Sequence, residues 1–365
     1  MSSSPRARAG RVATATLVSM LAVGCSAQKS PADADGEPTA PPTSATAQAT
    51  KYPLTIDNCG REVTFDKAPS RVVLLNGTSV AEVESFVTLG IQDRILANSQ
   101  SYGVSDEPGM VEKVAAVPTN GLSLNENFEV PREQVLALKP DLVISTWAGG
   151  FDEKIGSISR DQLDQAGIDS FVTPVNCAYG APDARQEDQE KYDHQSVESS
   201  FDLLLALGEI FDVQKKAADY VNEARTTLAD ISSEVKGAEP KSVLVAYPGM
   251  AMMNNNGLPA VFGGGIYDDI IDRAGGVNAF AGKDTTELAE INAEALASAK
   301  VDVLVIGLFQ PNEDGKLLAE DLFRKFPGWA ASKTKTYTTV SDGFYLGPFN
   351  TVAVRKIADA AHAKS

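Results

Sequence analysis

Short apolar runs alternate with stretches of helical periodicity along most of the chain. Runs typical of buried strands occupy residues 71–75, 94–97, 141–145, 170–173, 242–246, 301–306 and 336–340. Helical patterns lie between them, at 80–89, 132–138, 161–166, 267–274, 293–299, 315–323 and 352–362. Because such alternation is typical of parallel sheets with helices on both faces, we expect an α/β fold.

The longest helical pattern lies between the two halves of the chain. Its apolar positions recur every three or four residues, at Val213, Ala217, Val221, Ala224, Leu228, Ile231 and Val235. A helix over residues 214–235 would be about 33 Å long. We expect it to bridge two lobes as a rigid connector; the alternative is an ordinary packing helix of one lobe.

An internal repeat favours two similar lobes. Residues 133–144 (EQVLALKPDLVI) align without gaps with residues 294–305 (EALASAKVDVLV), so that in each half an acid opens a helix and an aspartate introduces a strand. We therefore expect an N-terminal lobe at 52–212, a linking helix at 213–237 and a C-terminal lobe at 238–365.

The N-terminal segment has the pattern of a lipoprotein signal peptide at 1–24. Three arginines precede an apolar stretch at 12–23 that is too short to span a bilayer. The sequence LAVGC at 21–25 resembles a bacterial lipobox, in which Cys25 is lipidated; the alternative is a secretory signal with a chance cysteine. Residues 25–51 are rich in Ala, Thr and Pro, and we expect a flexible tether.

Composition narrows the possible functions. The 365 residues include 32 Lys and Arg against 49 Asp and Glu, a net charge of −17, which disfavours nucleic-acid binding. The sequence contains two histidines, and so small a number disfavours a histidine metal site or a Ser-His-Asp triad. In an exported protein the two cysteines after Cys25, Cys59 and Cys177, are expected to form a disulfide; the alternative is two buried thiols.

The glycine patterns do not indicate an enzyme. The chain contains no Gly-x-Ser-x-Gly elbow, and the segments at 263–265 and 276–283 lack the spacing of dinucleotide or phosphate loops. We expect a binding protein without catalytic activity and without a resident cofactor.

Several segments, in their order and spacing, resemble the cluster A, or class III, substrate-binding proteins of ABC importers, which serve iron-siderophores, haem and cobalamin. They are residues 58–65 with 68–73, 84–90 with 93–95, 138–144, 207–211, 263–265 with 274–280, and 301–306. The resemblance covers about residues 54–363. It implies a periplasmic-binding-protein-like α/β fold: two α/β lobes with mainly parallel central sheets, bridged by one long α-helix. Actinobacterial-type members also carry cysteines at the positions of Cys59 and Cys177.

The resemblance also implies a mechanism. A monomer anchored by lipid to the outer face of the cytoplasmic membrane would capture a small-molecule metal chelate between its lobes and deliver it to an ABC permease and its ATPase. In this family one glutamate on each lobe pairs with permease arginines. The N-lobe acid maps on Glu133. Val277 occupies the usual C-lobe position, so we assign Glu294, the repeat partner of Glu133, with Glu290 next. Stabilisation of a first helical turn is the alternative role for Glu133 and Glu294.

Ligand in such a fold contacts loops at the carboxyl ends of the strands. The side chains expected there are Asn76, Tyr102, Trp147 and Tyr179 from the N-lobe and Tyr247, Asn254, Phe309 and Tyr345 from the C-lobe, with Trp147 and Tyr247 favoured. For each, local core packing is the alternative. The nearest cation is Arg185, in a polar stretch at 182–194 that we expect to be mobile.

Because strongly anionic chelates require several convergent cations, we expect a neutral or weakly charged metal complex and no direct binding of a bare metal ion. An iron-siderophore is the first candidate. Haem or a cobalamin-type macrocycle is the alternative within the same class, and a surface sensor or a chelatase-like protein is the alternative outside it.

Overall fold

The computed structural model describes residues 48–75, 80–253 and 257–363. The predicted signal peptide, Cys25 and residues 25–47 of the tether lie outside these ranges, as do Asn76 and Asn254. Within them, no helix is both long and apolar enough to cross a bilayer.

The N-lobe is built around a parallel four-stranded sheet of order β4-β3-β5-β6. In the central pairing, Leu74 of β3 lies opposite Ile144 of β5, and both side chains are fully buried. Helices cover both faces, which explains why these strands are continuous apolar runs. The strands are β3 (Val72–Leu74), β4 (Ile95–Asn98), β5 (Leu142–Ser145) and β6 (Asp169–Val172). The helices are α1 (Ala81–Leu89), α2 (Met110–Ala115), α3 (Arg132–Leu138), α4 (Arg160–Gln165), α5 (Gln186–Asp193) and α6 (Val197–Ile210), with 3₁₀ turns η1 (Gln92–Arg94), η2 (Ala148–Phe151), η3 (Glu153–Ile155) and η4 (Pro174–Asn176).

A hairpin of β1 (Leu54–Asn58) and β2 (Arg61–Phe65) precedes this sheet. Its two turn residues, Cys59 and Gly60, both have positive φ, at 61° and 75°, as tight two-residue hairpins require. Cys59 forms a disulfide with Cys177, with a Cα–Cα distance of 5.0 Å. The structure thus contains the predicted bridge, which ties the hairpin to the segment after β6.

The C-lobe contains a mixed sheet of order β11-β10-β7-β8, with β9 also paired to β7. Only β8 runs antiparallel to β7; the other pairs are parallel. The strands are β7 (Lys241–Tyr247), β8 (Ala260–Phe262), β9 (Gly276–Asn278), β10 (Val303–Gly307) and β11 (Tyr337–Val340). The helices are α8 (Gly265–Arg273), α9 (Thr285–Ala289), α10 (Ala293–Ser298), α11 (Gly315–Lys325), α12 (Ala330–Thr334) and α13 (Asn350–Ala361), with 3₁₀ segments η5 (Pro248–Met253) and η6 (Asp342–Phe344).

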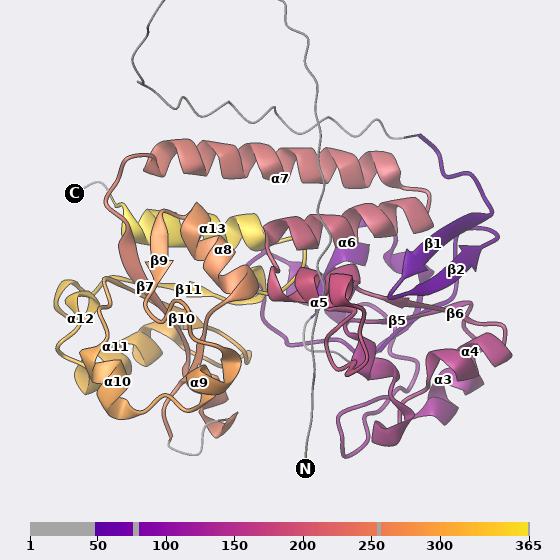
Figure 1. Ribbon diagram of the computed structural model, residues 1–365, viewed down its shortest axis with the longest axis horizontal. Coiled ribbons are helices and arrows are strands. Elements are labelled where there is room, and N and C mark those ends of the chain that lie inside the picture. The colour runs from indigo at the N-terminus through magenta and orange to yellow at the C-terminus, as the bar shows by residue number, and fades with distance from the viewer. Residues whose placement is uncertain (1–47, 76–79, 254–256, 364–365) are drawn as a thin grey trace, which may run out of the picture. The chain divides into compact units, whose positions relative to one another are not determined.

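The bridging helix is α7 (Gln214–Val235), a continuous helix of 22 residues. It packs against α6 of the N-lobe and against α13 and α8 of the C-lobe (Figure 1). The predicted apolar stripe forms its buried face, including Ala217, Val221 and Ile231. The helix therefore bridges both lobes, and the alternative of a helix belonging to one lobe is wrong.

The internal repeat corresponds to two equivalent structural units. In the N-lobe, Asp141 precedes β5, and its carboxylate accepts hydrogen bonds from the backbone N–H of Ser70 and Arg71 at the start of β3, each at 2.8 Å. In the C-lobe, Asp302 precedes β10 and accepts a hydrogen bond from the backbone N–H of Ser242 at the start of β7, at 3.0 Å. Each aspartate thus holds the neighbouring central strand in register.

Several elements were not predicted. The polar stretch at 182–194, expected to be mobile, contains α5, because Arg185 pairs with Asp188 across its first turn and the helix packs on η4. The pattern also missed α2, α6, α9, α12, β8 and β9, most of which are short, so that their periodicity is weak.

A candidate ligand-binding cavity between the lobes

A cavity of about 410 Å³ has walls from both lobes. Most of its lining comes from segments that follow strands, at the edge where α/β sheets bind ligands, and the rest comes from α5 and the connection after it, the end of β8 and the start of α8. The residues are Tyr102, Thr146, Asn176, Tyr179, Tyr192 and Gln195 from the N-lobe, and Met250, Phe262, Ile266, Tyr267, Phe309, Phe344, Tyr345 and Leu346 from the C-lobe.

The N-lobe wall is a short stack of aromatic rings. Tyr179 lies between Trp147, at 5.0 Å between ring centroids, and Tyr192, at 5.4 Å with nearly parallel planes. Backbone hydrogen bonding fixes this stack, because the N–H of Gly149 donates to the carbonyl of Tyr179. Of these three rings, Tyr179 and Tyr192 line the cavity, whereas Trp147 lies behind them.

The C-lobe wall is a second aromatic series. Tyr267 stacks on Phe262 at 5.2 Å and contacts Phe344 at 5.0 Å. Behind them lies Tyr247, which is fully buried and meets Phe262 edge-on. Rings locked against one another in this way lose little side-chain entropy when they stack on a ligand.

Tyr102 connects the two walls. Its ring lies 5.2 Å from that of Phe309 and 5.5 Å from that of Tyr345, both in the C-lobe. The loop carrying Phe309 is itself fixed, because the backbone N–H groups of Phe309 and Gln310 donate to the carboxylate of Glu313. The ring of Tyr345 lies on the cavity surface, while its hydroxyl is buried beneath it.

The polar part of the lining leads to a buried carboxylate. Gln195 donates to the side chain of Asn176 at 3.0 Å, and Asn176 donates to the backbone carbonyl of Thr146 at 2.7 Å. The hydroxyl of Thr146 donates in turn to Glu82 at 2.7 Å. Glu82 is fully buried and also accepts hydrogen bonds from Gln100 and Thr173.

The cavity presents no formal charge on its described lining residues. Burial raises the pKa of the Tyr102, Tyr179, Tyr192 and Tyr267 phenols above the ordinary value, so they remain neutral hydroxyls at physiological pH. Arg185 is occupied elsewhere by Asp57, Glu187 and Asp188. In the described part of the chain, no three His, Cys, Asp or Glu side chains are placed to hold a metal ion.

Of the predicted contacts, Tyr102, Tyr179, Phe309 and Tyr345 lie on the cavity surface. The two favoured ones do not line it in this conformation, because Trp147 lies behind Tyr179 and Tyr247 behind Phe262. Sequence reasoning missed Phe262, Tyr267, Tyr192 and Gln195. Phe262 and Tyr267 adjoin the Gly263–Gly265 segment that was singled out, so an aromatic pair flanking that loop was the available signal.

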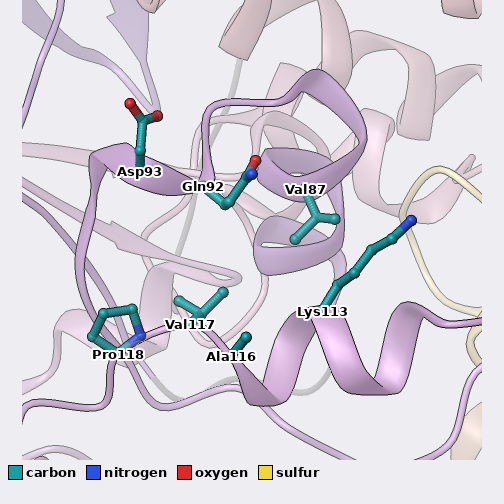
Figure 2. Close-up of a pocket in the computed structure, with 7 residues that line it drawn as sticks. All are labelled: Val87, Gln92, Asp93, Lys113, Ala116, Val117 and Pro118. Atoms are coloured by element: carbon teal, nitrogen blue, oxygen red, sulfur yellow. The ribbon is translucent and has the colours of Figure 1, made fainter.

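A larger hollow, of about 470 Å³, lies on the N-lobe between α1 and α2. Figure 2 shows Val87, Val117 and Pro118 around it, with the ends of the Asp93 and Lys113 side chains pointing apart. All seven lining residues come from one lobe, and the two charged groups do not converge on a common point. It is therefore a weaker candidate than the aromatic cavity.

The two predicted docking acids occupy equivalent places. Glu133 lies in the first turn of α3 and Glu294 in the first turn of α10, and both are exposed. Each helix precedes a parallel strand, so these N-termini lie at the carboxyl edge of the sheets, on the side away from α7 (Figure 1). Glu133 pairs with Arg132 at 2.9 Å; its pKa is lowered by hydrogen bonding to its own backbone and then to Arg132.

Two α/β lobes joined by one long helix, with an aromatic cavity between them, define a binding protein of the helix-bridged type. The family model described as periplasmic binding protein matches residues 76–340, and the chain belongs to this family. The resemblance inferred from the sequence segments is thereby confirmed.

The individual relatives have low sequence identity to this chain. An ABC transporter substrate-binding lipoprotein of Bacillus subtilis, YvrC, is 28% identical over 246 residues, which span 65% of this chain and 63% of that protein. The chain thus spans less than two thirds of the length of that relative.

Solved structures share the fold. A structure from the Fe3+-hydroxamate transport system of Saccharomonospora viridis has a TM-score of 0.61 at 21% identity, covering 86% of this chain and all of that one. The periplasmic haem-binding protein BhuT, in complex with two haems, has a TM-score of 0.55 at 20% identity, covering 80% of this chain and 99% of that one.

Proposed function

We propose that this protein is the substrate-binding component of an ABC importer, capturing a ferric chelate of the iron-siderophore type between its lobes. The observation that carries the proposal is the inter-lobe cavity, with aromatic walls and no formal charge on its described lining. Iron held inside an uncharged organic chelate needs no metal ligands from the protein. Stacking rings and a few hydroxyl and amide groups suffice to hold the organic shell.

The rest of the mechanism follows from this role. The protein is a monomer without catalytic activity or resident cofactor, held by lipidated Cys25 at the outer face of the cytoplasmic membrane. The loaded form presents Glu133 and Glu294 to arginines of the permease, which acts with its ATPase. YvrC, the curated relative described above, is itself named as an ABC transporter substrate-binding lipoprotein, which supports this assignment.

Haem is the second candidate ligand. The haem-bound structural relative favours it, since a planar macrocycle could lie between the Tyr179–Tyr192 pair and the Phe262–Tyr267 pair. The two propionates of haem argue against it, because the described lining offers them no cation.

Ligand titration tests the proposal. Quenching of intrinsic tryptophan fluorescence is measured with ferric hydroxamates, ferric catecholates, haem and cobalamin. The proposal expects ferric hydroxamates to bind most tightly. Exclusive binding of haem or cobalamin would replace the ligand but keep the importer assignment, whereas turnover of any ligand would place the protein in another class.

A further inference from the structure

Carboxyl groups lie just outside the cavity lining, and the described lining contains no Lys or Arg. Glu82 lies directly behind the lining residue Thr146, and Glu313 lies behind Phe309. The carboxyls of Glu84, near Tyr102, and of Asp342, two residues before Phe344, are also buried; burial raises the pKa of both, which favours their neutral forms. Carboxyl groups therefore lie behind lining residues of both lobes, and the cavity surface is formed largely by electron-rich rings.

Burial raises the pKa of the Glu82 carboxyl, and the hydrogen bonds donated to this group oppose that shift by stabilising its charged form. The backbone N–H of Val83 donates to the side-chain oxygen of Gln100, which turns the Gln100 amide nitrogen toward Glu82 as a donor at 3.0 Å. Thr146 and Thr173 add two hydroxyl donors. The described residues place no Lys or Arg on this carboxylate, so its field extends into the cavity.

The cations on the cavity's periphery are neutralised by acids. Lys356 pairs with Asp106 at 2.6 Å, and Arg185 is held by three acids. Lys191 precedes Tyr192 on α5, but Lys191 is exposed and lies between Glu190 and Asp193 in the sequence. An anionic ligand would thus lose its hydration without gaining a counterion, while a cation would gain contact with ring faces and with the carboxylate field.

We propose that this cavity selects its ligand by charge, accepting neutral or cationic chelates and rejecting anionic ones, and that Glu82 is a specificity-determining residue acting through Thr146. The inference rests on the proposed function and adds the charge of the substrate to it. A ligand charge separated from Glu82 by one layer of side chains should change affinity by roughly tenfold per charge, at the effective dielectric typical of proteins.

The test uses three ferric complexes of one linear trihydroxamate: with a free terminal amine, with that amine acetylated, and with it succinylated. They share the iron centre and carry charges of plus one, zero and minus one. Affinities are measured by calorimetry on the purified protein. We expect the cationic and neutral complexes to bind at least about tenfold more tightly than the anionic one. Equal or preferred binding of the anionic complex would overturn the proposal.

Variants identify the source of the preference. Glu82→Gln keeps hydrogen-bonding capacity and removes the charge, and should reduce the gap between the cationic and anionic complexes several-fold; an unchanged gap in the folded variant would also overturn the proposal. Gln195→Lys places a cation on the lining without altering Glu82 and should shift preference toward the anionic complex, which keeps the test decisive if Glu82→Gln misfolds. Glu223→Gln on the exposed face of α7 is the matched control and should leave the gap unchanged.

The same titrations distinguish a wrong ligand assignment from a wrong charge preference. If none of the three complexes binds, the siderophore-type assignment is wrong. The same variants are then titrated with haem, whose propionates are anionic. Both Glu82→Gln and Gln195→Lys must bind haem more tightly than the parent protein, or the charge selection is wrong as well.

Discussion

Asp106 and Lys356 form an ion pair across the two lobes, with 2.6 Å between Oδ1 and Nζ. Asp106 lies in the N-lobe loop after β4, and Lys356 lies on α13 of the C-lobe. The same carboxylate accepts hydrogen bonds from the backbone N–H groups of Ser341 and Gly343, while the N–H of Asp106 donates to Asp342 at 2.6 Å. The lobes are thus joined by a partly buried polar contact as well as by α7.

Removing this contact should destabilise the protein. Asp106→Ala leaves two backbone donors without an acceptor and the Lys356 ammonium without its ion-pair partner, and we expect a loss of about 2–4 kcal/mol in the free energy of unfolding. Urea denaturation provides the measurement. Asp219→Ala removes an exposed helix pair with Lys215 and serves as control, with an expected loss below about 0.5 kcal/mol. Equal effects of the two variants would contradict the structural role of Asp106.

Glu129 makes stability depend on pH. Burial raises the pKa of its carboxyl from 4.5 to about 7, so the folded protein keeps this proton up to about pH 7 while the unfolded chain releases it near pH 4.5. The contribution of Glu129 to stability is therefore fully present below about pH 4.5 and is lost as the pH rises through this window, by up to about 3 kcal/mol. Glu129→Gln should match the parent near pH 4 and exceed it in stability at pH 8. Denaturation at the two pH values checks this.

The exposed neighbour Glu126 supplies the control for that experiment. Glu126→Gln changes the same charge without burial, so its difference from the parent should not vary with pH. A Glu129→Gln variant that is no more stable than the parent at pH 8 would show that the Glu129 carboxylate is accommodated in the folded state.

The disulfide should contribute strongly to stability. It closes a loop with a sequence separation of 118 residues. In the chain-entropy model such a loop is worth about 3–5 kcal/mol, because the bridge restricts the unfolded chain. The double variant Cys59→Ala, Cys177→Ala should lose about this much in chemical denaturation. If the reduced parent protein and the variant are both as stable as the oxidised parent, the chain-entropy estimate fails here.

Ligand binding should be reported by one tryptophan. Trp147 contacts Tyr179 in the cavity wall, whereas Trp329 is buried in the C-lobe core, where its ring nitrogen donates to the carbonyl of Leu296. Trp147→Phe should remove ligand-induced quenching while retaining affinity within a few-fold, measured by calorimetry. Trp329→Phe should keep the quenching. Quenching that survives in Trp147→Phe would mean that the ligand binds elsewhere or that the fold changes globally.

The docking acids can be tested separately from the ligand. Glu133→Lys and Glu294→Lys should abolish uptake of a labelled ferric chelate by cells and leave ligand affinity unchanged, because both side chains are exposed and outside the cavity lining. Glu223→Lys on α7, on the side away from these helices, is the matched charge-reversal control (Figure 1). A collapse of ligand affinity in either variant would place that acid in folding or binding instead.

Much of the fold could be predicted from local pattern. The apolar stripe of α7 recurs over six turns, and a helix of that length needs no tertiary information to be identified. The aspartates at 141 and 302 marked two equivalent units because each must satisfy the first backbone donors of a neighbouring strand. Short elements such as β9 and α12 were missed because three to five residues carry too little periodicity.

The sequence by itself determined the two-lobed α/β class, the bridging helix, the half-cystine positions and an aromatic, uncharged character for the ligand-contacting loops. Only the tertiary structure decided which rings face the cavity. Tyr247 and Tyr267 are both tyrosines of the C-lobe, yet Tyr247 is covered by Phe262 while Tyr267 lines the cavity. The position of a residue along a strand or loop fixes where its side chain starts. The packing of neighbouring side chains decides whether that side chain is covered or lines the cavity. The position of Glu82 behind Thr146 follows from the same cause, since α1 and the β5 loop meet only in the folded chain.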